Sequence, residues 1–105
     1  MKTLLYAPRK STTRNSVVVI PKELIPQLHF PKEEVLLSNY DQIQRRKDLE
    51  HAILLGNVYQ SKVTILFEDI EGVKKVMTTV WGLTDERVIL KQNITLPIHR
   101  IIQLK

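Results

Sequence analysis

The C-terminal part of the chain, residues 61–105, constrains the fold more than any other segment. It consists of short stretches rich in β-branched and aromatic residues, with very few turn residues between them. So many β-type stretches in so short a span are typical of a small five-stranded β-barrel. Barrels of this size more often bind other molecules than catalyse reactions. The strands that we expect cover residues 62–67, 76–81, 87–91, 94–98 and 101–104.

The turns between these strands carry their own signals. Gly72 follows a run of acidic residues, and we expect it to adopt a positive φ angle in a hairpin turn. Pro97 cannot donate a hydrogen bond to a neighbouring strand, so it marks a strand end or an edge. Residues 97–100 predict a tight helical turn before the last strand.

The strongest helix signal begins at Ser38, which is a plausible N-cap. Asp41 then falls in the first turn, where a carboxylate suits the helix dipole. The sequence predicts a helix over residues 39–55, with Gly56 as a left-handed stop. The apolar positions that we expect to face the core are Ile43, Leu49, Ala52 and Ile53.

The N-terminal third divides into two kinds of segment. Residues 1–16 carry several basic residues and no acid, which is typical of a basic arm. Residues 17–20 form a β-type run that can cover a barrel edge, and residues 21–26 predict one helical turn. We therefore divide the single α+β domain into residues 1–37, a basic arm with Pro-punctuated segments, and residues 38–105, a helix plus the barrel.

Composition sets the class of protein. With 105 residues, 43% hydrophobic and 26% charged, the chain is one small globular domain. It has no cysteine, which excludes disulfides, thiolate metal sites and thiol nucleophiles and fits a reducing cytoplasm. Its longest clean apolar run is far too short to span a membrane, so we expect a cytoplasmic protein with no membrane partner.

Catalytic and metal-binding patterns are absent from the sequence. The three histidines show no metal-ligand spacing, and three glycines cannot build a phosphate-binding loop. Thr78 and Thr79 lie in a predicted strand, where threonine is favoured for its β-branching alone. We expect neither an enzyme nor a cofactor.

Charge favours an acidic partner. The net charge is +5, and basic residues gather in three places that one surface can bring together. We therefore predict contacts with RNA through this basic surface. The residues that we expect to contribute are Arg9, Lys10 and Arg14 in the arm, Arg45, Arg46 and Lys47 in the helix, and Lys91, His99 and Arg100 near the C-terminus.

Three patches carry a resemblance to a known family. They are Val63-Thr-Ile-Leu-Phe67 with Gly72-Val-Lys74, then Asp85-Glu-Arg-Val-Ile-Leu-Lys91, and Ile98-His-Arg-Ile-Ile102. Together with the preceding helix they resemble the Sm-like group of SH3-like small barrels, which includes the bacterial host-factor RNA chaperone and the Rho-inhibiting protein Rof. The resemblance covers about residues 40–105. It implies an RNA-contacting role for His99.

The resemblance has departures. Host-factor proteins carry an aromatic residue and a lysine just before the histidine, whereas Leu96, Pro97 and Ile98 stand here. The basic-glycine motif of the eukaryotic proteins is also missing, because residues 91–93 read Lys-Gln-Asn. The Gly56-Asn57-x-Tyr59 and Thr79-Val80-Trp81 blocks are similar to small proteins of Bacteroidota, a likeness that implies no particular activity.

Trp81 offers an alternative function. In a regular strand it shares a face with Met77, Thr79 and Leu83, and we expect the chain's own helix to cover that face. An exposed Trp81 would instead be a docking residue for a protein partner or a stacking residue for a base. The protein is then an interaction adaptor or small regulator. Open barrel edges also make a homo-oligomer plausible, unless residues 17–20 cover such an edge.

Overall fold

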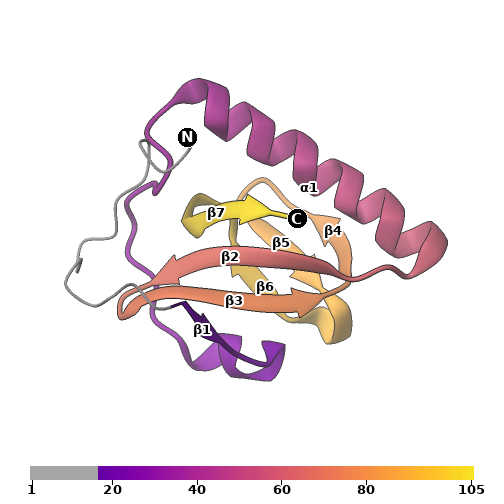
Figure 1. The fold of residues 1–105 in the computed structure, drawn as a ribbon, viewed down its shortest axis with the longest axis horizontal. Coiled ribbons are helices and arrows are strands. Elements are labelled where there is room, and N and C mark those ends of the chain that lie inside the picture. The colour runs from indigo at the N-terminus through magenta and orange to yellow at the C-terminus, as the bar shows by residue number, and fades with distance from the viewer. Residues whose placement is uncertain (1–16) are drawn as a thin grey trace.

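One long helix lies against two β-sheets in this protein (Figure 1). The computed structural model describes residues 17–105. The helix, α1, covers Asn39–Tyr59, and three short 3-10 helices are η2 (Lys22–Gln27), η3 (Lys91–Asn93) and η4 (Ile98–Arg100). The strands are β1 (Val18–Val19), β2 (Val63–Asp69), β3 (Gly72–Thr78), β4 (Val80–Leu83), β5 (Arg87–Leu90), β6 (Thr95–Pro97) and β7 (Ile101–Leu104).

The strands of residues 17–105 form two sheets, and neither closes into a barrel. The larger sheet has the order β1-β3-β2-β7 and the smaller has the order β4-β5-β6. Every neighbouring pair is antiparallel except β1 with β3. The α+β class is confirmed, and the five-stranded closed barrel that we expected is not formed by the described strands.

The two sheets separate at Thr79. We expected a single strand over residues 76–81, but β3 ends at Thr78 and β4 begins at Val80. Thr79 turns the chain from the first sheet into the second, and its carbonyl accepts a hydrogen bond from the Lys91 amide at 3.0 Å. The physical reason is burial. Thr78, Thr79 and Val80 are buried in succession, so the inside–outside alternation on which the single-strand prediction depended is interrupted at Thr79.

The core lies between the sheets and under the helix. Alternate residues of β2 and β3 point inward, as the pattern of Val63, Ile65 and Phe67 predicted. Leu49 and Ala52 of α1 complete this core, whereas Ile43 is exposed, contrary to our expectation. The buried apolar residues of this cluster are Ile20, Ile25, Leu49, Ala52, Val63, Ile65, Phe67, Val76, Val80, Val88, Leu90, Leu96, Ile98 and Ile101.

The start of α1 is confirmed and its end is not. The Ser38 hydroxyl accepts a hydrogen bond from the Asp41 amide at 3.1 Å, as expected of an N-cap. The helix continues past Gly56 to Tyr59, and Gln60 adopts the left-handed conformation instead. Gly56 serves a packing role, because a Cβ there would overlap the Val80 carbonyl oxygen and lie 2.9 Å from Thr79 Cγ2. It lets α1 approach β4 closely.

Several local expectations are confirmed. Gly72 has a φ of 144°, which only glycine adopts readily. Residues 98–100 form the tight turn η4 before β7, and β6 ends at Pro97. The run at residues 17–20 covers the edge of β3, since Val18 and Val19 pair with Lys74 and Lys75. This strand therefore shields an edge within the chain.

Candidate binding surfaces

Residues 29–36, which we call the strap, lie across one end of the sheets and are held there by hydrogen bonds. The His29 carbonyl accepts from the Ile70 amide at 2.8 Å, and the Val35 amide donates to the His99 carbonyl at 3.0 Å. His99 Nε2 lies 3.0 Å from the Pro31 carbonyl oxygen. Because a carbonyl can only accept, this nitrogen carries the proton. The ring of His99 therefore holds the strap in place.

The buried side chain of Arg100 also binds the strap through a hydrogen bond. Its side chain is 2% exposed and donates from Nη1 to the Glu33 carbonyl at 2.6 Å. The same guanidinium donates from Nε to the Glu68 carbonyl at 3.1 Å and from Nη2 to the Glu68 carboxylate at 3.0 Å. All of these contacts lie within the fold. Arg100 is therefore a structural residue, and its charge is matched by the buried Glu68.

Arg45 joins the strap to α1. Its guanidinium donates to both carboxylate oxygens of Glu34, at 2.7 and 2.8 Å, and to the Ile101 carbonyl at 3.0 Å. The residue is 7% exposed, and its Nε has no hydrogen-bond partner among the described residues. A bidentate pair of this kind fixes both partners, and removing either one leaves a desolvated charge.

Glu34 is held in its charged form. Its partial burial raises its pKa, but hydrogen bonds from Arg45 and from the Leu36 amide together lower it by more. The pKa of Glu34 therefore lies below its ordinary value of 4.5. The strap consequently stays ion-paired to α1 at neutral pH.

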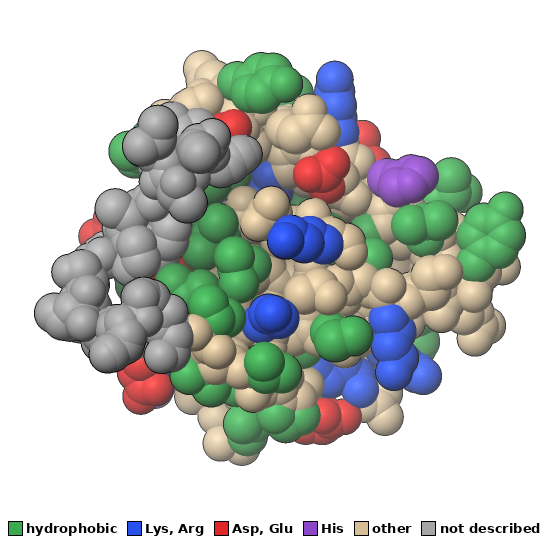
Figure 2. Space-filling view, viewed as in Figure 1, with side chains coloured by type: hydrophobic (Ala, Val, Ile, Leu, Met, Phe, Trp, Pro, Cys, Tyr) green, Lys and Arg blue, Asp and Glu red, His purple; other side chains and the backbone are tan. Residues whose placement is uncertain are grey.

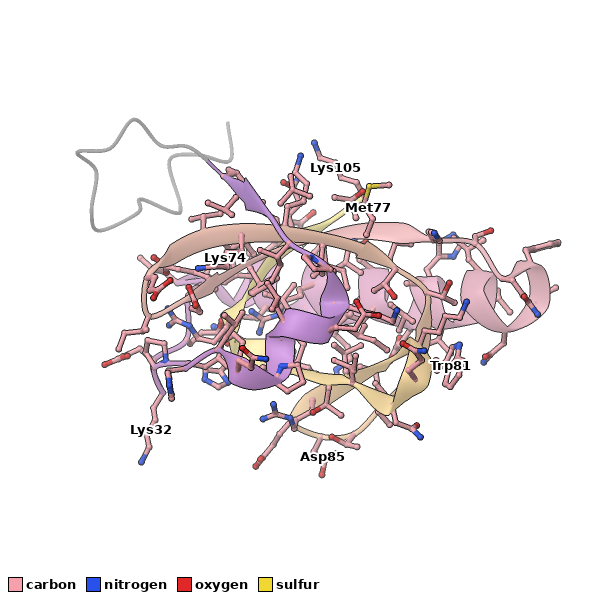
Figure 3. All side chains as sticks on the ribbon, turned by 90° about the horizontal axis from the view of Figure 1, so that it is seen from below. Lys32, Lys74, Met77, Trp81, Asp85 and Lys105 are labelled. Atoms are coloured by element: carbon pink, nitrogen blue, oxygen red, sulfur yellow. The ribbon has the colours of Figure 1, made fainter. Side chains whose placement is uncertain are left out.

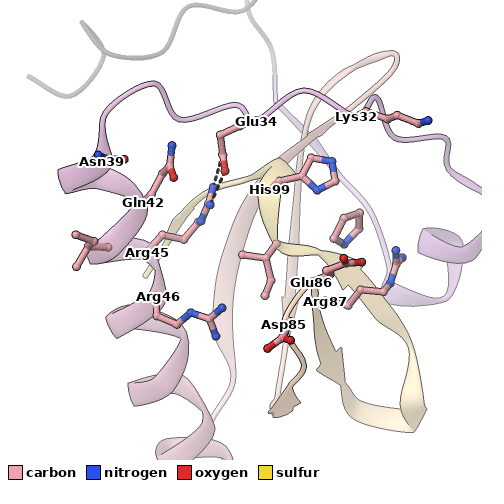
Figure 4. A pocket seen from close by; sticks show the side chains of 13 residues that line it. Lys32, Glu34, Asn39, Gln42, Arg45, Arg46, Asp85, Glu86, Arg87 and His99 are labelled. Atoms are coloured by element: carbon pink, nitrogen blue, oxygen red, sulfur yellow. Dashed lines mark hydrogen bonds and ion pairs between the residues drawn. The ribbon is translucent and has the colours of Figure 1, made fainter.

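A groove of about 760 Å³ runs between α1, the strap and the turn that joins β4 to β5 (Figure 4). Arg46 reaches into it from α1 and faces the turn that carries Asp85 and Glu86, whereas Lys32 points away from α1. The residues that line the groove are Lys32, Glu34, Asn39, Gln42, Ile43, Arg45, Arg46, Asp85, Glu86, Arg87, Pro97, Ile98 and His99.

The charges of the groove are mixed. Arg45 and Glu34 neutralise each other in an ion pair. The basic side chains of the groove that remain are Lys32, Arg46 and Arg87. Asp85 and Glu86 oppose them from the β4–β5 turn. A polyanion would meet both signs of charge here. The groove therefore suits a ligand that carries both signs better than a chain of phosphates.

A second surface surrounds Trp81 on the outer face of the smaller sheet. Val80 pairs with Leu90 and Gly82 pairs with Ile89, so Trp81 is the extra residue of a β-bulge. A bulge redirects a side chain, and Trp81 is 43% exposed. The side chain of Ile89 lies over Gly82, since a Cβ on that glycine would be 3.6 Å from Ile89 Cδ1. We call Trp81, Gly82, Arg87, Ile89 and Thr95 the Trp81 surface.

The expected environment of Trp81 is wrong in two respects. Met77 and Trp81 project from different sides of the molecule (Figure 3), and Thr79 is buried rather than on a shared outer face. The bend at Thr79 and the bulge at Trp81 break the alternation on which that expectation depended. Gly56 of α1 packs on the backbone of β4 at Val80, but it leaves the indole of Trp81 partly open to solvent.

The predicted basic residues are only partly brought together. Arg45, Arg46 and His99 line one groove, while Lys47 and Lys91 are exposed outside its lining. Arg45 and Arg100 are buried in ion pairs, which does not fit the phosphate contacts that we expected of them. Arg9, Lys10 and Arg14 lie outside the described residues.

Sequence reasoning missed Lys32, Asn39, Gln42 and Arg87 as lining residues of the groove. Arg87 stands at the start of β5, and its Nε donates to the Thr95 hydroxyl at 2.9 Å. An exposed arginine beside a polar turn is a usable signal for such a residue. Lys32 and Asn39 gave no such signal, because Lys32 reaches the groove only through the path of the strap and Asn39 only through the placement of the first turn of α1.

Residues 17–105 contain neither a metal-binding cluster nor a membrane-spanning helix. Within this range His, Asp and Glu side chains do not gather in groups of three that could hold a metal ion. No helix there has both the length and the apolar character needed to cross a membrane. The groove and the Trp81 surface are the candidate binding sites of the described residues.

Comparisons with known proteins add no assignment. No family model matches the chain, and no curated protein or solved structure matches it significantly.

Proposed function

We propose that this protein is a non-enzymatic module that docks another polypeptide through the Trp81 surface. The observation that carries the proposal is the partly exposed indole of Trp81, which stands at a β-bulge next to Gly82 and the Ile89 side chain that packs on it. Tryptophan and arginine are enriched among the residues that dominate protein–protein binding energy. Arg87 stands on the same sheet and also lines the groove.

Charge distribution supports a polypeptide partner over RNA for residues 17–105. Four of the 16 basic residues, but none of the 11 acidic ones, lie within residues 1–16. The remainder of the chain is therefore close to neutral. Lys74 is also unavailable to a polyanion, because its ammonium group is buried and lies 2.8 Å from the carboxylate of Asp69. On the face shown in Figure 2, the described Lys and Arg side chains stand scattered among apolar and polar ones.

The test is affinity capture with matched variants. Trp81→Ala should lose the partner that the wild type retains, because truncation of a central aromatic anchor typically costs about 2 kcal/mol or more. Met77→Ala is the control, since Met77 is also exposed but projects from another side. Quantitative mass spectrometry of the captured proteins reads out the difference. A partner set that is identical for both variants would contradict the proposal.

A second candidate function is RNA binding through the groove. Arg46 and His99 were both expected to contact RNA, and both line it together with Arg87. The Sm-like resemblance belongs to this proposal. The order of helix, strands, η4 and a last strand that pairs with β2 supports it.

The RNA candidate is tested by fluorescence anisotropy of a labelled single-stranded RNA at low and physiological salt. Phosphate contacts predict affinity that falls log-linearly with salt, and Arg46→Glu should weaken it. Arg45→Glu is unsuitable for this purpose, because it would break the Glu34 pair inside the fold. Absence of binding at low salt would contradict RNA binding and would leave the polypeptide partner standing.

A further inference from the structure

The helix α1 has a second apolar face that nothing in the described chain covers. Tyr40, Ile43, Leu54 and Val58 are between 55% and 72% exposed. Figure 1 shows α1 along one margin of the molecule, with the sheets on one side of it and none of the described elements on the other. These four residues, together with Lys47, are called the outer stripe.

The outer stripe follows helical periodicity. Its members are separated by three, four, seven and four residues, so they share one side of α1. The buried residues Arg45, Leu49, Ala52 and Gly56 have the same kind of spacing and occupy the opposite side. The helix is therefore apolar on both sides, although the fold buries only one of them. A long helix of this kind normally has a partner on each apolar side.

The outer stripe is self-complementary when it is reversed. Apolar residues occupy both ends, and polar residues occupy the centre, where Lys47 of the stripe is flanked by the exposed side chains of Glu50 and His51. In an antiparallel pair of helices with the two-fold axis near position 49, Tyr40 meets Val58 of a second copy. Ile43 then meets Leu54 of the second copy, and Lys47 lies between Glu50 and His51 of the second copy.

Charge decides the direction of the pairing. A parallel pair would place Lys47 against Lys47 and Glu50 against Glu50, which is repulsive. The antiparallel pair replaces these contacts with two symmetric attractive ones. Such a pair is also isologous, which is the commonest arrangement of homodimers.

We propose that the outer stripe of α1 binds a second copy of this chain as an antiparallel helix pair. The 21 residues of α1 provide a contact about 30 Å long. One helix pair buries less area than the ~1,600 Å² of a standard interface, so the dimer is expected to dissociate in the micromolar range. The Trp81 surface remains free in this dimer, because β4 packs on the opposite side of α1.

Sedimentation equilibrium of the full chain tests the proposal. The wild type should show a concentration-dependent mass that approaches twice that of the monomer. Ile43→Glu should weaken the dimer at least tenfold, because it places a charge in the apolar contact. Ile70→Glu is the matched control, since Ile70 is equally exposed but lies in the β2–β3 turn, and it should leave the dimer unchanged. Circular dichroism should report the same helix content for all three proteins.

A charge exchange tests the direction of the helices. Lys47→Glu and Glu50→Lys should each be monomeric alone, and a mixture of the two should form a heterodimer. The chain has no cysteine, so single-cysteine variants report contacts directly. Tyr40→Cys mixed with Val58→Cys should form a disulfide-linked heterodimer, whereas Tyr40→Cys alone should not crosslink.

Three outcomes would overturn the proposal. A wild type that stays monomeric at the highest concentration would show that a second copy does not occupy the stripe. Dimerisation that Ile43→Glu and Ile70→Glu leave equally intact would place the interface elsewhere, for example at a sheet edge. Efficient self-crosslinking of Tyr40→Cys would show that the two helices run parallel rather than antiparallel.

Discussion

At the residue scale, the charged side chains divide into structural and accessible ones. Arg45 and Arg100 look like surface residues in the sequence, but each is buried and bonded to a carboxylate and to backbone carbonyls. Arg46, the neighbour of Arg45, reaches into the groove instead. Helical geometry explains the difference, because adjacent residues point in different directions around the axis.

Replacement of Arg100 by methionine should destabilise the protein strongly. The change leaves the carboxylate of Glu68 buried without its partner, which costs about 3–5 kcal/mol. Arg87→Met is the control, because Arg87 is exposed, and its free energy of unfolding should change by less than about 0.5 kcal/mol. Urea denaturation measures both. Equal stability of the two variants would contradict the structural role of Arg100.

Glu34 makes stability depend on acid pH. Its pKa is lowered in the folded protein relative to 4.5, so its contribution is fully present above the unfolded pKa. That contribution is lost as the pH falls through the lower, folded pKa. The free energy of unfolding of the wild type should therefore exceed that of Glu34→Gln at neutral pH. The difference should shrink below pH 4.5 and vanish in stronger acid, as measured by urea titrations at several pH values. A pH-independent difference would contradict the ion pair as its cause.

At the scale of elements, α1 is positioned by the packing of its backbone on β4. Gly56 allows this approach, because its missing side chain makes room for the Val80 carbonyl and for Thr79 Cγ2. The helix also closes the core with Leu49 and Ala52 and is tied to the strap by Arg45. The close approach at Gly56 therefore affects both the core and the groove.

Gly56→Ala should lower the free energy of unfolding by about 1–3 kcal/mol, even though alanine favours helices more than glycine does. The added methyl group would collide with backbone, which cannot move aside cheaply. Gly82→Ala is the matched control. A Cβ there meets only Ile89 Cδ1 at 3.6 Å, an ordinary contact. Thermal unfolding of the two variants distinguishes them, and a stabilised Gly56→Ala protein would show that α1 can shift away from β4.

At the scale of the whole molecule, the net charge of the chain does not describe the charge of residues 17–105. The excess of basic residues lies in residues 1–16, while residues 17–105 are nearly balanced. Buried pairs such as Lys74 with Asp69 remove further charge from the surface. Any affinity for nucleic acid should therefore draw on the charge of residues 1–16 in addition to the basic side chains of the groove.

Neutralising Arg9, Lys10 and Arg14 to glutamine should weaken the low-salt affinity for single-stranded RNA, in addition to any loss caused by Arg46→Glu in the groove. Each phosphate contact on a single strand contributes about 0.7 to the slope of log affinity against log salt, so the slope should become shallower by about 2. Fluorescence anisotropy over a salt series measures the slope. A variant with Lys22, Lys62 and Lys105 neutralised is the control with the same change in charge. Equal losses in the two variants would assign the binding to net charge alone.

Local structure was largely predictable from the sequence. The N-cap at Ser38, the positive φ at Gly72 and the turn η4 all depend on neighbours within a few residues. Most strand segments were also found, because alternation of apolar residues is a local signal, but the strand predicted over residues 76–81 spans the end of β3 and the start of β4. The role of Gly56 was not predictable, since the atoms that it avoids belong to residues more than twenty positions away.

The candidate surfaces were less predictable than the fold. Trp81 was singled out as the sole tryptophan, but its exposure depends on a bend at Thr79 and a bulge that only pairing with β5 creates. The sequence shows which residues are basic, but it did not predict that Arg45 and Arg100 are buried. Whether an arginine meets solvent or a carboxylate depends on segments that approach it from elsewhere in the chain, as Glu34 approaches Arg45.

The sequence by itself determined the class of this protein: a small cysteine-free α+β domain with one capped helix, closely spaced strands and a basic N-terminus. These features depend on composition and on short-range patterns, which can be recognised without knowledge of the fold. Tertiary structure alone decided that the strands form two sheets, that Arg45 and Arg100 fasten the strap, and that Trp81 and the outer side of α1 face solvent. Burial and pairing are relations between distant residues, so no local pattern contains them.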